Sequence, residues 1–278
     1  MLDPGFYIRT VFAEDSAMSN STEHRSTTRV LDALELVAGG GRDGYTLTEL
    51  CQRLDVPKSS MFPILHTLCE RGYLTLHPDS GRYTTGPSAL RLGNAYLENI
   101  DALDEITKEL RTITAACSET SYFATLKGGN AFYLAKADSP EPIRMVAAIG
   151  HSLPAYSTGI GKALLADCSL SDLKRLYPQG MKPLTPNTIT DFQMLDEQLR
   201  QAQESGFSYE SEESTPYIRC IAVPLRKDGR IVAAVSVAVP VFRYTEEKEE
   251  LIRLLLKTAK QRIEHLFLDI HLDPDRLS

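Results

Sequence analysis

"DVPKSSMFPILHTL" (residues 55–68) combines a helical pattern with a proline that should interrupt it. The spacing of its apolar residues predicts a helix from about Ser59 to Glu70, with one apolar face made by Met61, Ile64, Leu65 and Leu68. An interior proline removes a backbone hydrogen bond and costs about 3 kcal/mol. If Ser59 or Ser60 is the N-cap, however, Pro63 falls at the fourth or third helical position, where at most one bond is lost. We therefore expect a helix that continues through Pro63.

The residues away from the apolar stripe are expected to face outward: Ser59, Ser60, Phe62, Pro63, His66 and Thr67. Short hydroxyls beside Lys58 at a helix start suit contacts with phosphates and base edges, because free N–H groups point there as well. Two interpretations of Phe62 and Pro63 stay open. Their rings either meet thymine methyls in a DNA groove, or pack on a neighbouring hairpin or subunit.

The flanking segments complete a small domain. "TTRVLDALELVAGGG" (residues 27–41) predicts a helix that ends in glycines, with an apolar face made by Val30, Leu31, Leu34 and Val37. Thr46 and Glu49 have the spacing of a capping box, which begins a second helix. Beyond Gly72, residues 73–76 and 82–85 alternate on either side of a turn and predict a hairpin. Three helices and a hairpin in this order predict a winged helix-turn-helix over residues 23–87, and Arg82 of the hairpin joins the candidate DNA contacts.

The rest of the chain predicts a different architecture. A linker helix over residues 88–100, whose part 89–97 is a candidate dimer contact, precedes a domain of residues 101–278. Its first helix should bury Leu103, Ile106, Leu110 and Ile113. Strands are expected at 121–137 (a hairpin), 143–150, 207–211, 218–226 and 231–239, and helices at 157–168, 169–177, 189–206 and 245–267. Strands in hairpins with helices between them predict an α+β domain on an antiparallel sheet.

Length and composition agree with two soluble domains. The chain has 278 residues, of which 42% are hydrophobic and 24% charged. No apolar run approaches the roughly 18 residues of a membrane span, and the start of the chain does not resemble a signal peptide. We therefore expect a cytoplasmic protein without a membrane partner. Residues 1–22 are polar and lack a period, which predicts a disordered lead-in.

Charge and cysteines narrow the choice of partner. The net charge is −7, but residues 24–86 carry seven basic and seven acidic residues. A polyanion such as DNA would therefore meet this neutral part most easily. The five cysteines are odd in number and include no C-x-x-C pair. This argues against a disulfide framework and a zinc ribbon, and we expect no metal site.

"YSTGIGKALLA" (residues 156–166) resembles a phosphate-binding P-loop only in part. That pattern needs glycine where Tyr156 stands and a hydroxyl where Ala163 stands. What remains is a turn with Gly159 and Gly161 at the start of an apolar helix. Its amides favour an anion, although close packing alone would also explain the glycines.

The sequence gives little support for metal binding or for catalysis. Glu210, Glu212 and Glu213 form an acidic loop, which is most often solvated, and no histidine is near them in sequence. There is no G-x-S-x-G and no H-E-x-x-H. Cys220 and Ser236 are possible nucleophiles, but both lie in apolar strands and no base is indicated by spacing. We therefore assign no catalytic residue and no cofactor.

Five segments in this order resemble the IclR-type bacterial transcriptional regulators: residues 47–74, 81–93, 157–166, 210–213 and 219–240. The resemblance implies a winged-helix DNA-binding domain, a linker helix, a GAF-like effector domain, and homodimers or tetramers on operator DNA. The effector contacts that it implies are Gly159 and Ile160 through their amides, with Glu210, Cys220 and Ser236. Two positions depart from relatives. Ala238 replaces a hydroxyl found in some of them, and Pro63 replaces a basic residue found in many.

The leading hypothesis is a transcriptional regulator whose operator binding responds to a small carboxylate metabolite. A hydroxy, keto or sugar acid fits best, because Glu210 would accept a hydrogen bond from a ligand hydroxyl. Two alternatives belong to other classes: a cytoplasmic enzyme that acts on a small organic or sugar acid, and a sensor that binds protein instead of DNA. The residues do not identify the effector, the operator or the direction of regulation.

Overall fold

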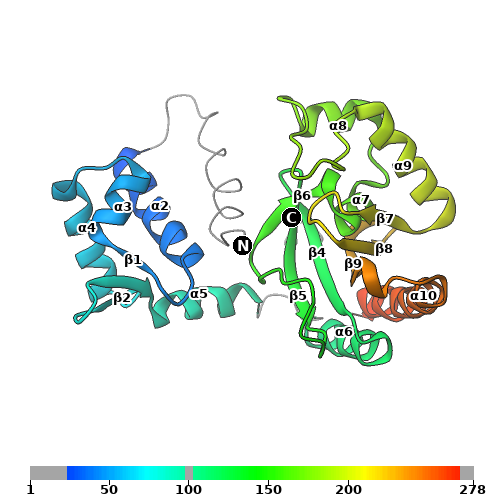
Figure 1. The fold of residues 1–278 in the computed structure, drawn as a ribbon, viewed down its shortest axis with the longest axis horizontal. Helices are drawn as coiled ribbons and strands as arrows, with labels where there is room; N and C mark the ends of the chain where they lie inside the picture. The colour runs from blue at the N-terminus through cyan, green and yellow to red at the C-terminus, as the bar shows by residue number, and fades with distance from the viewer. Residues whose placement is uncertain (1–23, 98–102, 270–278) are drawn as a thin grey trace. The chain divides into compact units, whose positions relative to one another are not determined.

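A computed structural model of the chain describes residues 24–97 and 103–269. The chain divides into two compact units, Met1–Asn99 and Ile100–Ser278, which are described separately (Figure 1). The predicted lead-in of residues 1–22 lies outside the described residues. Among the described helices, none is long and apolar enough to cross a bilayer.

The first unit is a winged helix-turn-helix. Its elements are α2 (Arg25–Gly39), β1 (Tyr45–Thr46), α3 (Leu47–Leu54), α4 (Lys58–Glu70), β2 (Leu74–His77) and β3 (Arg82–Thr85), followed by α5 (Pro87–Leu97). The strands form an antiparallel sheet in the order β1-β3-β2, so β3 is central and the β2–β3 hairpin is the wing. The predicted hairpin is confirmed, with its first strand displaced by one residue.

Apolar periodicity places the core of this unit. Ala33 and Val37 of α2 pack with Leu50 of α3 and with Met61 and Leu65 of α4. The predicted face of α2 needs one correction, because Leu31 is 52% exposed and Ala33 is buried in its place. The capping box at the start of α3 is confirmed: the Thr46 hydroxyl accepts from the Glu49 amide, and the Glu49 carboxylate accepts from the Thr46 amide at 2.7 Å.

The start of α4 differs from the sequence prediction. Pro57 is the N-cap, and its carbonyl accepts from the amides of Ser60 and Met61 at 3.0 and 3.1 Å. Pro63 is therefore the sixth helical residue and not the third or fourth, and it removes the bond to the carbonyl of Ser59. The helix tolerates the loss because Ser59 and Pro63 lie on its exposed side, where water can satisfy a carbonyl.

The second unit is built on a six-stranded antiparallel sheet in the order β6-β5-β4-β9-β8-β7. Its strands are β4 (Thr120–Lys127), β5 (Asn130–Ala137), β6 (Ser152–Pro154), β7 (Ser208–Ser211), β8 (Ile218–Lys227) and β9 (Arg230–Pro240). Its helices are α6 (Leu103–Cys117), α7 (Gly159–Leu165), α8 (Leu170–Leu176), α9 (Phe192–Ser205) and α10 (Glu246–Asp269), with short 3-10 turns η2 (Ala155–Ser157) and η3 (Val241–Arg243). This is the predicted α+β, GAF-like architecture.

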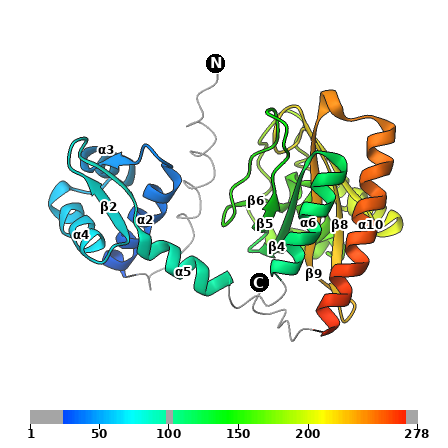
Figure 2. The same cartoon turned by 90° about the horizontal axis from the view of Figure 1, so that it is seen from below.

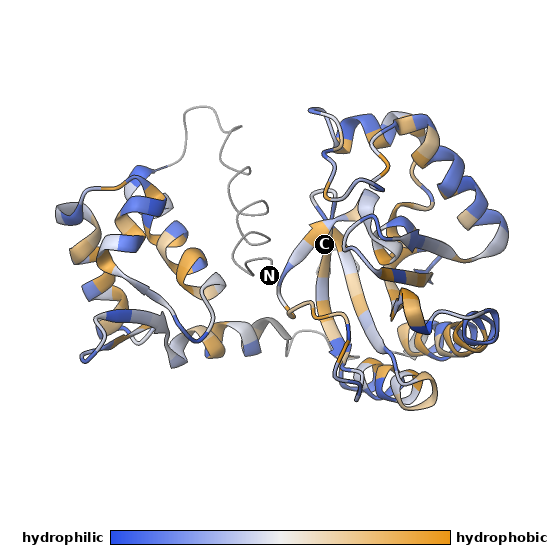
Figure 3. Ribbon diagram, in the orientation of Figure 1, coloured by the Kyte–Doolittle hydropathy of each residue, from blue (hydrophilic) through white to orange (hydrophobic). Residues whose placement is uncertain are grey.

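Helices cover both faces of this sheet. Helices α6 and α10 lie side by side on one face, with their apolar stripes turned inward (Figures 2 and 3). The predicted stripe of α6 is confirmed, since Ile106, Leu110 and Ile113 are buried. Helix α7 packs on the other face. Residues 143–150, predicted as a strand, are an irregular loop instead, and β6 begins only at Ser152. The loop is held by the Tyr122 hydroxyl, which bonds the Met145 carbonyl and the Ala147 amide.

A buried carboxylate before β4 connects this strand to η3 and α10. Glu119 is fully buried at the start of β4, and its two oxygens accept from the Arg243 guanidinium at 2.7 Å. One of these oxygens also accepts from Lys248 of α10 at 2.9 Å. Because a buried charge is tolerated only when it is paired, this cluster fixes η3 and α10 against β4.

Glu119→Ala should lower the free energy of unfolding by about 2–4 kcal/mol, because it leaves two cations without their shared partner. Urea denaturation of the full chain measures the effect. Glu105→Ala is the matched control, since its pair with Lys108 is exposed and should change stability by no more than about 0.5 kcal/mol. Equal effects of the two substitutions would contradict this account.

Candidate functional site

The outer face of α4 is the first candidate site. Lys58, Ser59, Phe62, Pro63 and His66 are exposed at helical positions that lie together on one side. Ser60 is half-buried. The helix has no side-chain N-cap and no acidic residue in its first turn. Its amino-terminal end therefore presents free N–H groups beside a cation, which favours an anion such as a DNA phosphate.

Further along this face, side chains contact neighbouring residues of the same helix. The His66 imidazole lies 3.5 Å from the Glu70 carboxylate and stacks loosely near the Phe62 ring, with 6.2 Å between ring centroids. The Thr67 hydroxyl donates to the carbonyl of Pro63 at 2.9 Å. Phe62 itself is 54% exposed, so within this chain it does not pack on the wing. The interpretations that remain for this ring are contact with DNA and packing on a second subunit.

Arg82 lies apart from that face. Its guanidinium donates to the Gly44 carbonyl at 3.0 Å and to the Glu49 carboxylate at 3.1 Å. Glu49 is the third helical residue of the α3 capping box, and the hydrogen bond from the Thr46 amide, together with the Arg82 pairing, lowers its pKa. The arginine therefore ties the wing to α3, and its predicted contact with DNA stays a prediction.

The second candidate site lies on the α7 face of the large sheet. Strand register places Glu210, Cys220 and Ala238 in one row across β7, β8 and β9. The next row on the same face contains Ala222, Ser236 and Tyr122. The sheet therefore brings together three of the predicted effector contacts, Glu210, Cys220 and Ser236.

The first turn of α7 lies against these rows. A Cβ atom added to Gly159 would come within 2.8 Å of the Cys220 Cβ, and one added to Gly161 within 2.3 Å of Ala155. The glycines are therefore required for close packing. The Gly159 carbonyl accepts from the Ser208 hydroxyl at 2.7 Å, and the Thr158 hydroxyl caps the amide of Gly161. Within the described chain, the amides of Gly159 and Ile160 have no hydrogen-bond acceptor.

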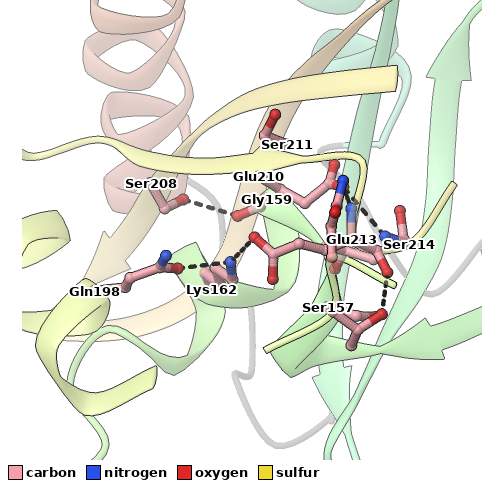
Figure 4. Close-up of polar contacts among 12 residues, drawn as sticks. Ser157, Gly159, Lys162, Gln198, Ser208, Glu210, Ser211, Glu213 and Ser214 are labelled. Atoms are coloured by element: carbon pink, nitrogen blue, oxygen red, sulfur yellow. Dashed lines mark hydrogen bonds and ion pairs between the residues drawn. The ribbon is translucent and has the colours of Figure 1, made fainter. Parts of the chain in front are cut away.

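Behind this turn lies a buried ion pair that the sequence analysis missed (Figure 4). Lys162 is 1% exposed. Its Nζ donates to Glu213 Oε1 at 2.5 Å and to Gln198 Oε1 of α9 at 2.7 Å. Burial lowers the pKa of Lys162, and the nearby Glu213 carboxylate opposes that shift. The available signal was a lysine inside the apolar run "GIGKALLA", which must find an acid if the helix is buried.

Glu210 is the member of the cluster with an unmet hydrogen bond. It is 3% exposed, and its Oε1 accepts from the amides of Glu213 and Ser214 at 2.5 and 3.1 Å. Its Oε2 is buried without a partner, as is Oε2 of Glu213. Burial raises the pKa of Glu210 to about 7 and raises that of the neighbouring Cys220 thiol as well.

The loop that carries these acids is held in an unusual backbone conformation. Glu212 and Tyr217 have φ of 59° and 65°, in the left-handed region that non-glycine residues seldom occupy. The Tyr217 amide donates to the Glu212 carboxylate at 2.9 Å, and the Glu213 carbonyl accepts from the hydroxyl of Thr188 at 2.6 Å. Such strain is concentrated at functional sites, so it supports a binding role for this loop. In the described residues, no group of three or more His, Cys, Asp or Glu side chains could hold a metal ion.

A winged helix with an exposed recognition helix, joined to an α+β unit with a buried polar cluster, defines a DNA-binding transcriptional regulator with a ligand-binding domain. Residues 26–78 match the family described as the IclR helix-turn-helix domain. Residues 94–264 match the family described as bacterial transcriptional regulator IclR, C-terminal. The chain belongs to the IclR family of transcriptional regulators.

Curated relatives and solved structures agree. The chain is 34% identical over 226 residues to the HTH-type transcriptional regulator BhcR of Paracoccus denitrificans, covering 81% of this chain and 80% of that protein. It is 32% identical over 220 residues to the HTH-type transcriptional regulator KdgR of Escherichia coli, covering 78% and 83%. An IclR transcriptional regulator from Alicyclobacillus acidocaldarius has a similar structure, with a TM-score of 0.77 at 25% identity over 88% of this chain and 99% of that one.

The raised pKa of Glu210 predicts how stability depends on pH. The folded state keeps a proton to about pH 7, whereas the unfolded state releases it near the ordinary value of 4.5. Stability therefore falls as pH rises through this window. Glu210→Gln removes this dependence. Relative to the wild type, the variant should gain roughly 2–3 kcal/mol of stability between pH 5 and pH 8. Urea denaturation at both pH values measures the difference, and a constant difference would show that Glu210 is ionised when folded.

Proposed function

We propose that this regulator binds operator DNA through the outer face of α4 and that a small carboxylate metabolite, bound in the second unit, changes that binding. It acts in the cytoplasm, where the chromosome lies, and represses its target. The observation that carries the effector half is Oε2 of Glu210, which is buried without a hydrogen-bond partner among the described residues. A buried polar atom without a partner is costly, and a ligand that supplies the partner gains that free energy on binding.

The DNA half rests on the exposed face of α4. Lys58, Ser59 and Ser60 would bind phosphate and base edges at the start of the helix, where free amides add donors. Phe62, Pro63, His66 and Thr67 would lie along the groove and choose among sequences by shape and apolar contact. Arg82 would contribute through the wing only if it exchanged Glu49 for a phosphate.

Lys58→Ala should weaken binding to every DNA sequence and lower the slope of log affinity against log salt by about one unit, since one phosphate contact is lost. Pro63→Arg should instead change which sequence is preferred. Fluorescence anisotropy with a duplex from beside the protein's own gene, and with a shuffled duplex of the same length, separates the two effects. If Pro63→Arg leaves the preference unchanged, this proline does not face the groove and the subunit-packing interpretation stands.

The effector half combines three kinds of group. The amides of Gly159 and Ile160 supply donors for a carboxylate. Cys220 and Ser236 supply a thiol, a hydroxyl and the apolar surface around them. A carboxylate ligand beside Glu210 is acceptable because burial raises the pKa of this residue to about 7, so the side chain is substantially neutral near that pH. Glu210 then either donates its own proton or accepts from a ligand hydroxyl, which favours hydroxy, keto and sugar acids over fatty acids.

A melting screen tests the effector class. An acid at about 100 times its dissociation constant should raise stability by roughly 2.7 kcal/mol. The corresponding amides should give no shift, because they lack the charge that the α7 amides attract. Ser236→Ala should reduce the shift while leaving DNA binding without ligand intact. Equal shifts from an acid and its amide would rule out anion recognition at the start of α7.

The regulator is proposed to act as a homodimer or tetramer. Leu90 of α5 is 66% exposed. Packing against a second copy of α5 would bury it. Sedimentation of Leu90→Asp against the wild type distinguishes a dimer through this helix from assembly elsewhere.

A further inference from the structure

The first unit contains a surface hollow that the proposed role of α4 does not use. It measures about 280 Å³ and is lined by Arg25, Thr28, Arg29, Asp32, Leu54, Asp55 and Val56. Its α2 residues, at positions 25, 28, 29 and 32, have the spacing of one helical face. The hollow therefore lies between the polar side of α2 and the turn that leads from α3 into α4.

Two cations, Arg25 and Arg29, line this hollow. Neither forms an ion pair with a residue of the described ranges. Arg25 is also the first residue of α2, a helix with no acidic residue in its first turn and no side-chain cap. A cation at this end of a helix is unfavourable, because the helix dipole is positive there. The arrangement becomes favourable when an anion lies against the two guanidinium groups.

The hollow is continuous with the start of the recognition helix. Asp55 and Val56 line it, and Lys58, the first residue of α4, follows only two positions later. Asp55 has a φ of 51° as the C-cap of α3, which fixes the tight turn between the two helices. A DNA strand that contacts Lys58 therefore passes beside Arg25 and Arg29.

The wing offers no substitute for these arginines. Arg82 is the one Lys or Arg of residues 73–86, and it is paired with Glu49. The other basic side chain of the wing, His77, is hydrogen-bonded to the Thr84 hydroxyl at 2.9 Å. Among the described residues, the wing therefore presents no Lys or Arg that is free of a protein partner.

We infer that Arg25 and Arg29 bind a backbone phosphate of the same DNA duplex that α4 contacts, and that this pair replaces the wing as the electrostatic anchor of the domain. The inference rests on the proposed contact between α4 and DNA. A planar guanidinium pair suits a phosphate, because each group can donate two parallel N–H bonds. Such a contact positions the protein but reads no sequence. Asp32 and Asp55 in the same hollow oppose the phosphate and limit the affinity.

The test uses the full chain with two duplexes of equal length, one from beside its own gene and one shuffled. Arg25→Ala combined with Arg29→Ala should weaken binding to both duplexes by the same factor, about tenfold, and lower the salt slope by roughly one to two units. Asp55→Asn should have the opposite sign and tighten binding to both about twofold, since asparagine tolerates the left-handed conformation. Arg111→Ala, at an exposed position of α6, is the matched control and should change neither value.

The outcomes separate this inference from the proposed function. Unchanged affinity and slope in the double arginine variant, with a loss in Lys58→Ala, would overturn the phosphate contact and leave α4 as the DNA-binding element. A loss confined to one duplex would also overturn it. If the double variant melts early, Arg25→Lys with Arg29→Lys takes its place and must retain at least half of the salt slope lost by the alanines. If the wild type binds neither duplex, the proposed function fails first.

Discussion

The buried charge of Lys162 is the constraint on which the second unit depends. A lysine inside an apolar helix is stable only when acceptors reach it, and these come from two distant segments, Glu213 of the acidic loop and Gln198 of α9. Meeting that requirement draws the loop over the sheet. Strand β7, which leads into this loop, pairs with β8 and places Glu210 in the same row as Cys220. The need to pair one cation therefore fixes the loop that borders the candidate effector site.

The two units use unsatisfied polar groups in opposite ways. In the first unit they are donors in water: the open amino-terminal end of α4 and the guanidinium groups of Arg25 and Arg29. Such groups lose little while free, because water solvates them, and they gain most from a polyanion that releases its counterions. In the second unit they are acceptors away from water, on Glu210 and Glu213. These are costly while free and therefore favour a small ligand that fits closely. The proposed DNA contact of the first unit is therefore sensitive to salt, and the proposed ligand contact of the second unit is sensitive to the shape of the ligand.

Local sequence patterns predicted most of the helices and strands, but not the side-chain pairs that connect elements distant in the sequence. The stripe of α6 and the capping box of Thr46 depend on neighbours in the sequence, and both are confirmed. Residues 143–150 have the composition of a strand, but they pair with no strand of the described sheet. They form a loop that is held by Tyr122. The role of Lys162 escaped prediction because its partner lies 51 residues away. The pairing of Arg82 was invisible for the same reason, although the residue itself was noticed.

The close packing of Gly159 against Cys220 and of Gly161 against Ala155 also decides where this site can change over generations. Neither glycine can be replaced by a residue with a side chain without moving a strand or a turn. The part of the site that would bind a carboxylate is therefore expected to keep both glycines. Ala238 and Ser236 lie beside this turn on the same face of β9, and both positions already carry a side chain. A descendant that recognises another acid, or a biosensor engineered for one, is expected to differ from this chain at positions 236 and 238 and to keep the glycine turn.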